Sequence, residues 1–208
     1  MATLLSSLTA MSVAADGSPQ NATLLMPKLQ FRFRLIFVNF GIDNDTTVLT
    51  RQVMDCSRPN VTFDEVTLNM YNSTMYLAGK HKWQTLSINI RDDASGGVAK
   101  LVGQQLQKQL DFAEQSSAAV GADYKFQLNI EVLDGGNGVN APVVLETWQL
   151  GGCFIQAANY NTLNYGTSDQ VSIALTVRYD NALQAPIATA GVGATIGRNL
   201  SGSSLATP

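Results

Sequence analysis

Hydrophobic and polar residues alternate over much of the chain between residues 28 and 181. In the clearest run, residues 124–132, apolar side chains alternate with polar ones: Tyr124, Phe126, Leu128, Ile130 and Val132 against Lys125, Gln127, Asn129 and Glu131. A period of two places the apolar side chains on one face of a β-strand. The same pattern predicts half-buried strands at 31–40, 83–91 and 171–179. Weaker runs predict strands at 48–56, 60–70 and 143–150, and a short strand after Gly151-Gly152.

One segment has a helical period instead. Apolar residues recur at every fourth position at Val98, Val102, Leu106 and Leu110. The preceding segment, residues 92–95, offers aspartate and serine side chains that can accept hydrogen bonds from the free amides of a helix start. The pattern predicts a helix over residues 98–115 that covers the apolar side of a sheet. Runs of strands around a single helix indicate a mainly β fold, an antiparallel sandwich or barrel.

The two ends of the chain differ in composition from this body. Residues 1–27 contain no Lys or Arg, so although Val13-Ala14-Ala15 resembles a cleavage site, the basic start of a secretory signal is missing. We expect a flexible N-terminal arm there. Residues 182–208 are rich in Gly, Ala and Ser, and Gly191, Gly193 and Gly197 approach a dinucleotide-binding spacing without a preceding strand. The predicted units are therefore an arm at 1–27, a β domain at 28–181 and a solvated tail at 182–208.

Composition excludes several classes of function. Of the 208 residues 45% are hydrophobic and 14% charged, and no apolar run is long enough for a membrane helix. The net charge of −3 does not favour tight binding of nucleic acid. A single histidine, His81, excludes most histidine-based metal sites, and we expect no cofactor. Cys56 and Cys153 could form a disulfide in an oxidising compartment, but buried free thiols are favoured.

The candidate catalytic groups are few. Asp64-Glu65 and Asp92-Asp93 are the only adjacent carboxylates, and neighbours in a strand point to opposite faces. The second pair stands at the predicted helix start, where capping is the simpler role. His81 lies in a polar segment that we expect to be a surface loop. With no phosphate loop, nucleophile elbow or metal cluster in the sequence, we expect no enzymatic activity.

The low charge has a consequence for the sheet edges. Isolated β domains usually protect their edges with Lys and Glu, and this chain has few such residues in its strands. An ordinary sandwich with one face in water remains one interpretation. The other is that the edges pair with further copies of the chain in a closed ring, because closure removes edges.

Several segments carry a resemblance when they are taken in order. They are Cys56-Ser57-Arg58-Pro59, residues 71–80, residues 83–88, residues 148–155, Leu163-Asn164-Tyr165 and residues 169–180. This series resembles the tail tube proteins of contractile-tailed (myovirus-type) bacteriophages, over roughly residues 29–181. The order of strands and the single helix agrees with the interpretation from periodicity.

The resemblance implies a structural role. Tail tube proteins form hexameric rings, each copy gives four strands to a continuous barrel, and the rings stack into a hollow conduit for DNA ejection inside a contractile sheath. The implied partners are other copies, the tail sheath protein, and baseplate and tail-terminator proteins, with DNA in transit but not specifically bound. The implied location is the virion tail, after assembly in the host cytoplasm. A baseplate tube initiator, the inner tube of a secretion system, and a secreted β-sandwich binding module are the alternatives.

By this analogy the strands that face the lumen are 48–56, 60–70, 124–132 and 143–150, in two hairpin-like pairs. A spacing of ~4.8 Å per strand around six copies gives a backbone diameter of about 37 Å, wide enough for duplex DNA. The lumen-facing candidates are Lys125, Gln127, Asn129, Glu131, Thr147 and Gln149, with Glu131 expected to offset the charge of Lys125. Such a wall should not hold phosphates.

Two further surfaces are predicted. The loop at 70–82 contains apolar residues in a polar segment, and its candidates for contact with the next ring are Met75, Tyr76 and Leu77. The outer face of the helix offers candidates for contact with the sheath, namely Gln104, Gln107, Lys108 and Asp111.

Overall fold

The structure is a computed structural model that describes residues 7–13, 19–25, 27–42, 46–135, 142–185 and 192, with the backbone alone for residues 7–25. Its described residues form strands β1 to β13 and helices α1 to α3. Every strand pairing is antiparallel. The prediction of a mainly β, antiparallel fold is confirmed, but two short helices, α1 (Thr47–Gln52) and α3 (Gly121–Tyr124), accompany the single helix that was predicted.

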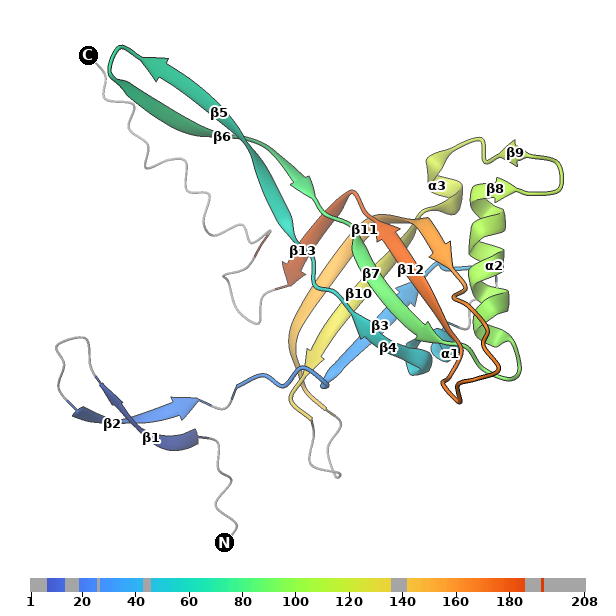
Figure 1. Cartoon of the computed structure of the whole chain (residues 1–208), viewed down its shortest axis with the longest axis horizontal. Helices are drawn as coiled ribbons and strands as arrows, with labels where there is room; N and C mark the ends of the chain where they lie inside the picture. The colour runs from blue at the N-terminus through green and yellow to red at the C-terminus, as the bar shows by residue number, and fades with distance from the viewer. Residues whose placement is uncertain are drawn as a thin grey trace, which may run out of the picture.

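One curved sheet forms the body of the molecule (Figure 1). Its strands follow the order β3 (Phe33–Val38), β10 (Phe126–Leu133), β11 (Val144–Asn159), β12 (Ser172–Arg178), β7 (Leu86–Arg91) and β4 (Val53–Cys56). A last strand, β13 (Asn181–Ala185), pairs with the first half of β11. Because β11 pairs with β10 and β13 in its first half and with β12 in its second, it joins two sheets that face each other across the core.

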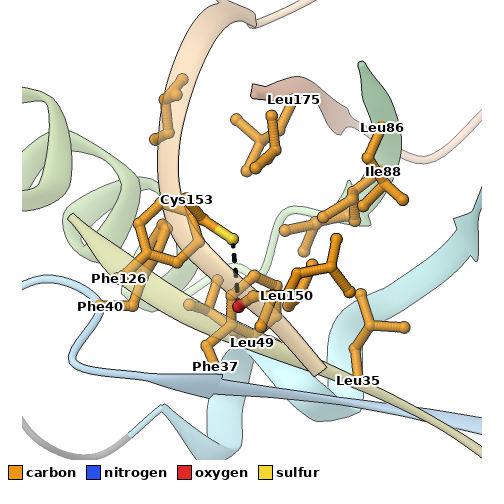
Figure 2. Close-up of a cluster of buried hydrophobic side chains, with 14 of the residues drawn as sticks. Leu35, Phe37, Phe40, Leu49, Leu86, Ile88, Phe126, Leu150, Cys153 and Leu175 are labelled. Atoms are coloured by element: carbon orange, nitrogen blue, oxygen red, sulfur yellow. Dashed lines mark hydrogen bonds between the residues drawn. The ribbon is translucent and has the colours of Figure 1, made fainter. Parts of the chain in front are cut away.

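The core is built from the alternating strands. Inward-facing side chains of the central strands are almost fully buried, and Figure 2 shows several of them packed around Cys153 and Leu150: Leu35, Phe37, Leu86, Ile88, Phe126 and Leu175. Phe40 contacts Phe126 edge to face, with ring centroids 4.9 Å apart. Of the apolar face predicted over residues 124–132, Phe126, Leu128, Ile130 and Val132 are buried in β10 as predicted. Tyr124 instead stands in a helical turn before the strand and is half-buried.

Helix α2 (Gly97–Gln109) lies beside the sheet (Figure 1). It begins as predicted, because the Val98 amide donates to Asp93 Oδ1 at 3.1 Å. The hydrogen bond from the Ser95 hydroxyl, followed by that from the Val98 amide, lowers the pKa of Asp93. The predicted end at residue 115 is wrong. Leu110 is already extended, and β8 (Leu110–Asp111) pairs with β9 (Ser116–Ser117). The helix ends at Gln109, whose side-chain amide forms two hydrogen bonds with the backbone of Ile155. Gln109 Nε2 donates to the Ile155 carbonyl at 2.9 Å, and the Ile155 amide donates to Gln109 Oε1 at 2.9 Å.

The strand predicted at 48–56 is partly wrong. Residues Thr47–Gln52 form helix α1, and only Val53–Cys56 form strand β4. Thr46 Oγ1 donates to the Phe37 carbonyl at 2.8 Å, and Leu49 is fully buried. Tertiary packing of this one leucine favours a helical turn over the strand preference of its threonine and valine neighbours.

The loop predicted at 70–82 is a strand. Residues Val61–Met70 (β5) and Ser73–Trp83 (β6) form a long hairpin that projects from the sheet (Figure 1). Residues 60–70 therefore pair with β6 and not with 48–56, while β4 pairs with β7. His81 lies in β6 and is exposed, so it is a surface residue of a strand and not of a loop.

The break predicted at Gly151-Gly152 is absent, because β11 runs through it for 16 residues. The pairing with β10 shifts between Leu150 and Cys153, and Gly152 has φ +68. A side chain at Gly152 would also collide with the Asp180 carboxylate. Glycine therefore lets one strand bulge and pass from one sheet to the other.

Both ends of the chain contain strands that the sequence did not predict. Ser7–Val13 (β1) and Pro19–Leu25 (β2) form an antiparallel hairpin where a flexible arm is expected, and it projects from the body in Figure 1. Strand β13 extends the β body to Ala185. Two predicted features lie outside the described residues. They are most of the turn after Asp134, at residues 136–141, and the glycines at 191, 193 and 197. Between α2 and β10 stands a single helical turn, α3 (Gly121–Tyr124).

Candidate assembly surfaces

The outward face of β10 and β11 gathers five of the six lumen-facing candidates. Asn129 stands opposite Gln149, and Glu131 stands opposite Thr147, so each pair shares a face. Gln127 lies two residues before Asn129 on the same face, because the buried residues of β10 alternate with it. Together these side chains form a polar strip along the sheet, in which all are uncharged except Glu131, whose charge is paired with Arg34. Whether it lines a lumen stays a prediction.

The charges of this face are neutralised in pairs. Arg34 on β3 donates to Glu131 Oε2 from Nε at 2.8 Å and from Nη2 at 2.5 Å. Lys125, which lies just before β10, donates to Asp180 Oδ2 at 2.5 Å, and this hydrogen bond raises the pKa of Lys125. The expected compensation of Lys125 by Glu131 is therefore wrong, since Asp180 pairs with Lys125 and Glu131 with Arg34.

The same face continues onto two strands that the sequence did not assign to it. Register places Ile36 and Val38 of β3 beside Asn129 and Gln127, and Leu183 of β13 beside Gln149. A shallow hollow of about 220 Å³ lies over Gln127, Asn129, Gln149 and Leu183. Residues 33–38 are nearly all apolar, so their sequence carries no period that tells the outer residues from the inner ones.

The sheet has unpaired edges. Among the described residues β3 pairs only with β10, β13 only with β11, and β4 only with β7. Strand β13 carries no charged residue, and its outward residue Leu183 is exposed. The backbone amides of β13 at Ala182 and Gln184 already donate to Asn181 Oδ1 and to the Val192 carbonyl. The edges of β3 and β4 can pair with another chain through their free backbone groups.

The hairpin β5–β6 presents a large apolar face. Val66 stands opposite Leu77, and Leu68 opposite Met75, with Met70 completing the face. The exposed fractions of these five side chains run from 41% at Leu68 to 58% at Met70. Of the predicted contact residues, Met75 and Leu77 lie on this face. Tyr76 lies on the opposite face, across from Thr67.

The apolar face changes sides along the hairpin. At the base, Val61 and Trp83 share one face, and Trp83 is 7% exposed, with its ring centroid 5.7 Å from that of Tyr179. Further out, the same face carries Glu65 and Thr67 instead. A register shift with one extra residue in β6 marks the change, and Lys82 Nζ donates to Asp64 there at 2.9 Å. The base therefore packs on its own barrel, while the distal apolar side chains point the opposite way.

The sheath candidates of α2 lie in several environments. Gln107 is exposed, and Lys108 is half-buried. Gln104 Oε1 accepts from the Ile42 amide at 3.3 Å, and Asp111 Oδ1 accepts from the amides of Ala113 and Glu114, which lower its pKa. The neighbouring Gln105, which periodicity did not identify, is fully buried and bonds Gly41 and Tyr124.

The side chains that could act in catalysis or bind a metal ion lie far apart among the described residues. Cys56 and Cys153 are free, and burial raises the pKa of each thiol to about 12. Asp64 is paired with Lys82 at the hairpin bulge. In the part of the chain that the structure describes, no group of three His, Cys, Asp or Glu side chains could hold a metal ion. No helix among these residues is long and apolar enough to cross a membrane.

Comparison with solved structures identifies the fold. A chain in the cryo-EM structure of the anti-feeding prophage (AFP) baseplate matches with a TM-score of 0.55 and 15% identity, over 79% of this chain and 99% of that chain. A chain of the PVC sheath-tube complex, an extracellular contractile injection system in its extended state, gives a TM-score of 0.56 and 13% identity over 77% and 93%. The PVC sheath/tube terminator gives 0.57 and 13% over 77% and 98%.

The fold is therefore that of tube and cap proteins of contractile injection systems, in agreement with the resemblance noted in the sequence. At these identities the likeness concerns the fold. A comparison with protein-family models finds no match. A comparison with the sequences of curated proteins finds none either.

Proposed function

We propose that this protein is a structural subunit of a phage tail tube. Hexameric rings of the chain stack into a hollow conduit for DNA ejection inside a contractile sheath. The fold likeness supports this role, and the AFP baseplate structure that contains one of the similar chains is six-fold symmetrised. The role is mechanical and needs neither a catalytic residue nor a cofactor.

The observation that carries the proposal is the exposed hairpin β5–β6. An isolated two-stranded hairpin is marginally stable in water and needs further strands or a packing partner. Here the distal half has an apolar face of five half-exposed side chains, and residues 66–79 contain no charged residue. A contiguous apolar patch of this kind marks a protein interaction site. The occupant we propose is a second copy of the chain.

Many repeated contacts in a ring can make an assembly stable although the apolar face of each hairpin is small. A stable pairwise interface buries roughly 800 Å² per partner, with about 20–30 residues on each side, whereas the apolar face of the hairpin has five side chains. In a closed ring each copy makes the contact twice, once as donor and once as acceptor, and stacked rings repeat it. Met75 and Leu77 are the proposed contact residues, and the edge of β3 adds main-chain pairing.

The polar face of β10 and β11 is the proposed wall of the conduit. Its candidates are amides, a hydroxyl and charges that are paired locally, as in Arg34–Glu131 and Lys125–Asp180. A wall without free cations gives phosphates no fixed counter-charge, so duplex DNA can slide along it. The helix face with Gln107 and Lys108 is the proposed contact with the sheath protein, and baseplate and terminator proteins contact the two ends of the tube.

Sedimentation velocity tests the proposal. The full chain at rising concentration should pass from monomer to a hexamer, without intermediate species of comparable abundance, because only a closed ring satisfies every edge. A monomer of 22.3 kDa at all concentrations would contradict the proposal. Abundance in the particle separates a tube subunit from a baseplate initiator, since a tube subunit is among the most plentiful proteins present.

A further inference from the structure

One buried carboxylate, that of Glu146, lies where several projecting segments leave the barrel. Glu146 is in β11, opposite Val132, on the side that Trp148 and Leu150 continue toward the core. Of the side chains that the structure describes, it is the only charged one that is buried. A carboxylate in such a place is costly unless its charge and its lone pairs are matched.

The two oxygens of Glu146 are fully used. Oε1 accepts from Trp148 Nε1 at 2.6 Å, from Gln184 Nε2 at 2.9 Å and from Arg58 Nη2 at 3.1 Å. Oε2 accepts from Arg58 Nη2 at 3.1 Å and from Lys28 Nζ. Burial opposes ionisation, but the hydrogen bonds of Lys28 and Trp148 and the charges of Arg58 and Lys28 outweigh it, so the pKa of Glu146 lies below its usual value.

Three of the four partners stand at the roots of different segments. Lys28 lies between the hairpin β1–β2 and strand β3, Arg58 lies between β4 and the hairpin β5–β6, and Gln184 lies in β13. These residues are 118, 88 and 38 positions from Glu146 in the chain. Gln184 also contacts Val192, because its backbone amide donates to the Val192 carbonyl at 2.7 Å. Figure 1 shows both hairpins projecting from the side of the barrel on which β13 lies.

The carboxylate also bridges the two ends of the sheet. Strands β3 and β4 end the strand order and do not pair with each other in the described part of the chain. Lys28 precedes β3 and Arg58 follows β4, so Lys28–Glu146–Arg58 is an ionic bridge between segments that no backbone ladder joins. An apolar residue would fill this end of the barrel at a lower desolvation cost, but it could not fix three polar partners.

We propose that Glu146 is a positioning residue, which sets the directions in which the N-terminal arm and the hairpin β5–β6 leave the barrel and fixes the end of strand β13 beside β11. The consequence for ring formation rests on the proposed function. The distal hairpin can reach a second copy only if its root is held, and Arg58 is three residues from the start of β5. Loss of Glu146 should therefore free the projecting segments and leave the barrel strands closed.

Hydrogen exchange followed by mass spectrometry tests this on the full chain. In Glu146→Gln, which keeps the volume and removes the charge, the backbone amides of residues 28–33, of residues 57–63 other than Pro59, and of residues 181–185 should exchange about tenfold faster than in the wild type. Amides of β7, β10 and β12 should be unchanged. Glu114→Gln, the same replacement at an exposed site, is the control and should alter none of these segments. A uniform rise over all strands, or no rise at the three roots, would overturn the proposal.

Two single replacements keep the test decisive if Glu146→Gln does not fold. Arg58→Met should speed exchange at 57–63 alone, and Lys28→Met at 28–33 alone, because each frees one segment. Equal effects of both variants on all segments would mean a general loss of stability and would count against positioning. Ring formation is measured in parallel. If the wild type forms no rings, the proposed function fails, while the exchange pattern still decides the role of Glu146.

Discussion

Gly79 lies against the backbone of Asp64 at the place where the hairpin β5–β6 changes its apolar face. A Cβ atom on Gly79 would stand 2.8 Å from the Asp64 carbonyl oxygen, closer than real Cβ contacts allow. The glycine thus permits the extra residue of β6 that accompanies the register shift. This bulge lies between the half of the hairpin that packs on its own barrel and the half that is free to contact another copy.

Replacing this glycine should therefore damage the hairpin. We expect Gly79→Val to reduce ring formation and to lower the free energy of unfolding by about 1–3 kcal/mol, because the added atoms meet backbone that cannot move away. The control is Gly103→Ala in α2, where a Cβ would meet nothing within 4 Å. That change should raise the free energy of unfolding by up to about 1 kcal/mol. Urea titration followed by circular dichroism measures both, and wild-type stability and assembly of Gly79→Val would contradict the bulge's role.

A charge on the apolar face of the hairpin should block assembly without unfolding the barrel. In Leu77→Glu the carboxylate would be buried unpaired against a second copy, whereas the monomer keeps it in water. Thr67→Glu places the same charge on the opposite face of the same hairpin and should assemble normally. Both monomers should stay within about 0.5 kcal/mol of the wild type, as exposed substitutions usually do. Size-exclusion chromatography with light scattering compares them, and equal assembly of the two variants would remove the face from the contact.

The paired charges of the polar face predict a change in DNA affinity. Replacing both Glu131 and Asp180 by their amides leaves Arg34 and Lys125 without their carboxylates, at a stability cost of about 0–1 kcal/mol per exposed pair. The assembled double variant should bind duplex DNA with an affinity that falls steeply with salt, whereas wild-type tubes should show no such binding. Fluorescence anisotropy at two salt concentrations measures this. Tubes of both proteins with the same weak affinity would show that this face does not meet DNA.

The two thiols predict a dependence on high pH. Because burial raises the pKa of Cys56 and of Cys153 from 9.0 to about 12, the fold favours the neutral thiols. Their contribution to stability is complete below pH 9 and is lost as the pH rises from 9 toward 12, where the unfolded chain ionises first. At pH 8 the native protein should resist iodoacetamide and show an intact mass without a disulfide. Rapid alkylation of both thiols in the folded state would contradict this.

Sequence periodicity is informative where a strand has one buried face. The alternation at β7, β10 and β12 identified strands whose inward residues are buried as expected, among them Ile88, Leu128 and Leu175. It is silent where both faces are exposed. In the hairpin, the adjacent residues Asp64 and Glu65 mark a change of phase, so β5 and β6 have no single apolar face over their whole length.

Other features depend on contacts that are distant in the sequence. Leu49 makes helix α1 favourable only because the barrel supplies its pocket, and the continuity of β11 through Gly152 depends on a bulge that lies against Asp180. Glu146 stands in a segment whose pattern predicts only a weak strand, and three of its four partners are 38 to 118 residues away. Of the proposed wall, the β10 and β11 residues were predictable from alternation, while the flanking Val38 and Leu183 were not.

The central claim is that identical copies of this chain complete one another's exposed sheet in a closed ring with an opening. Negative-stain imaging of the purified full-length protein tests it most directly. We predict ring-shaped particles with six-fold class averages and a central hole, together with hollow filaments at higher concentration. A field of small, solid particles of monomer size at every concentration would contradict the account.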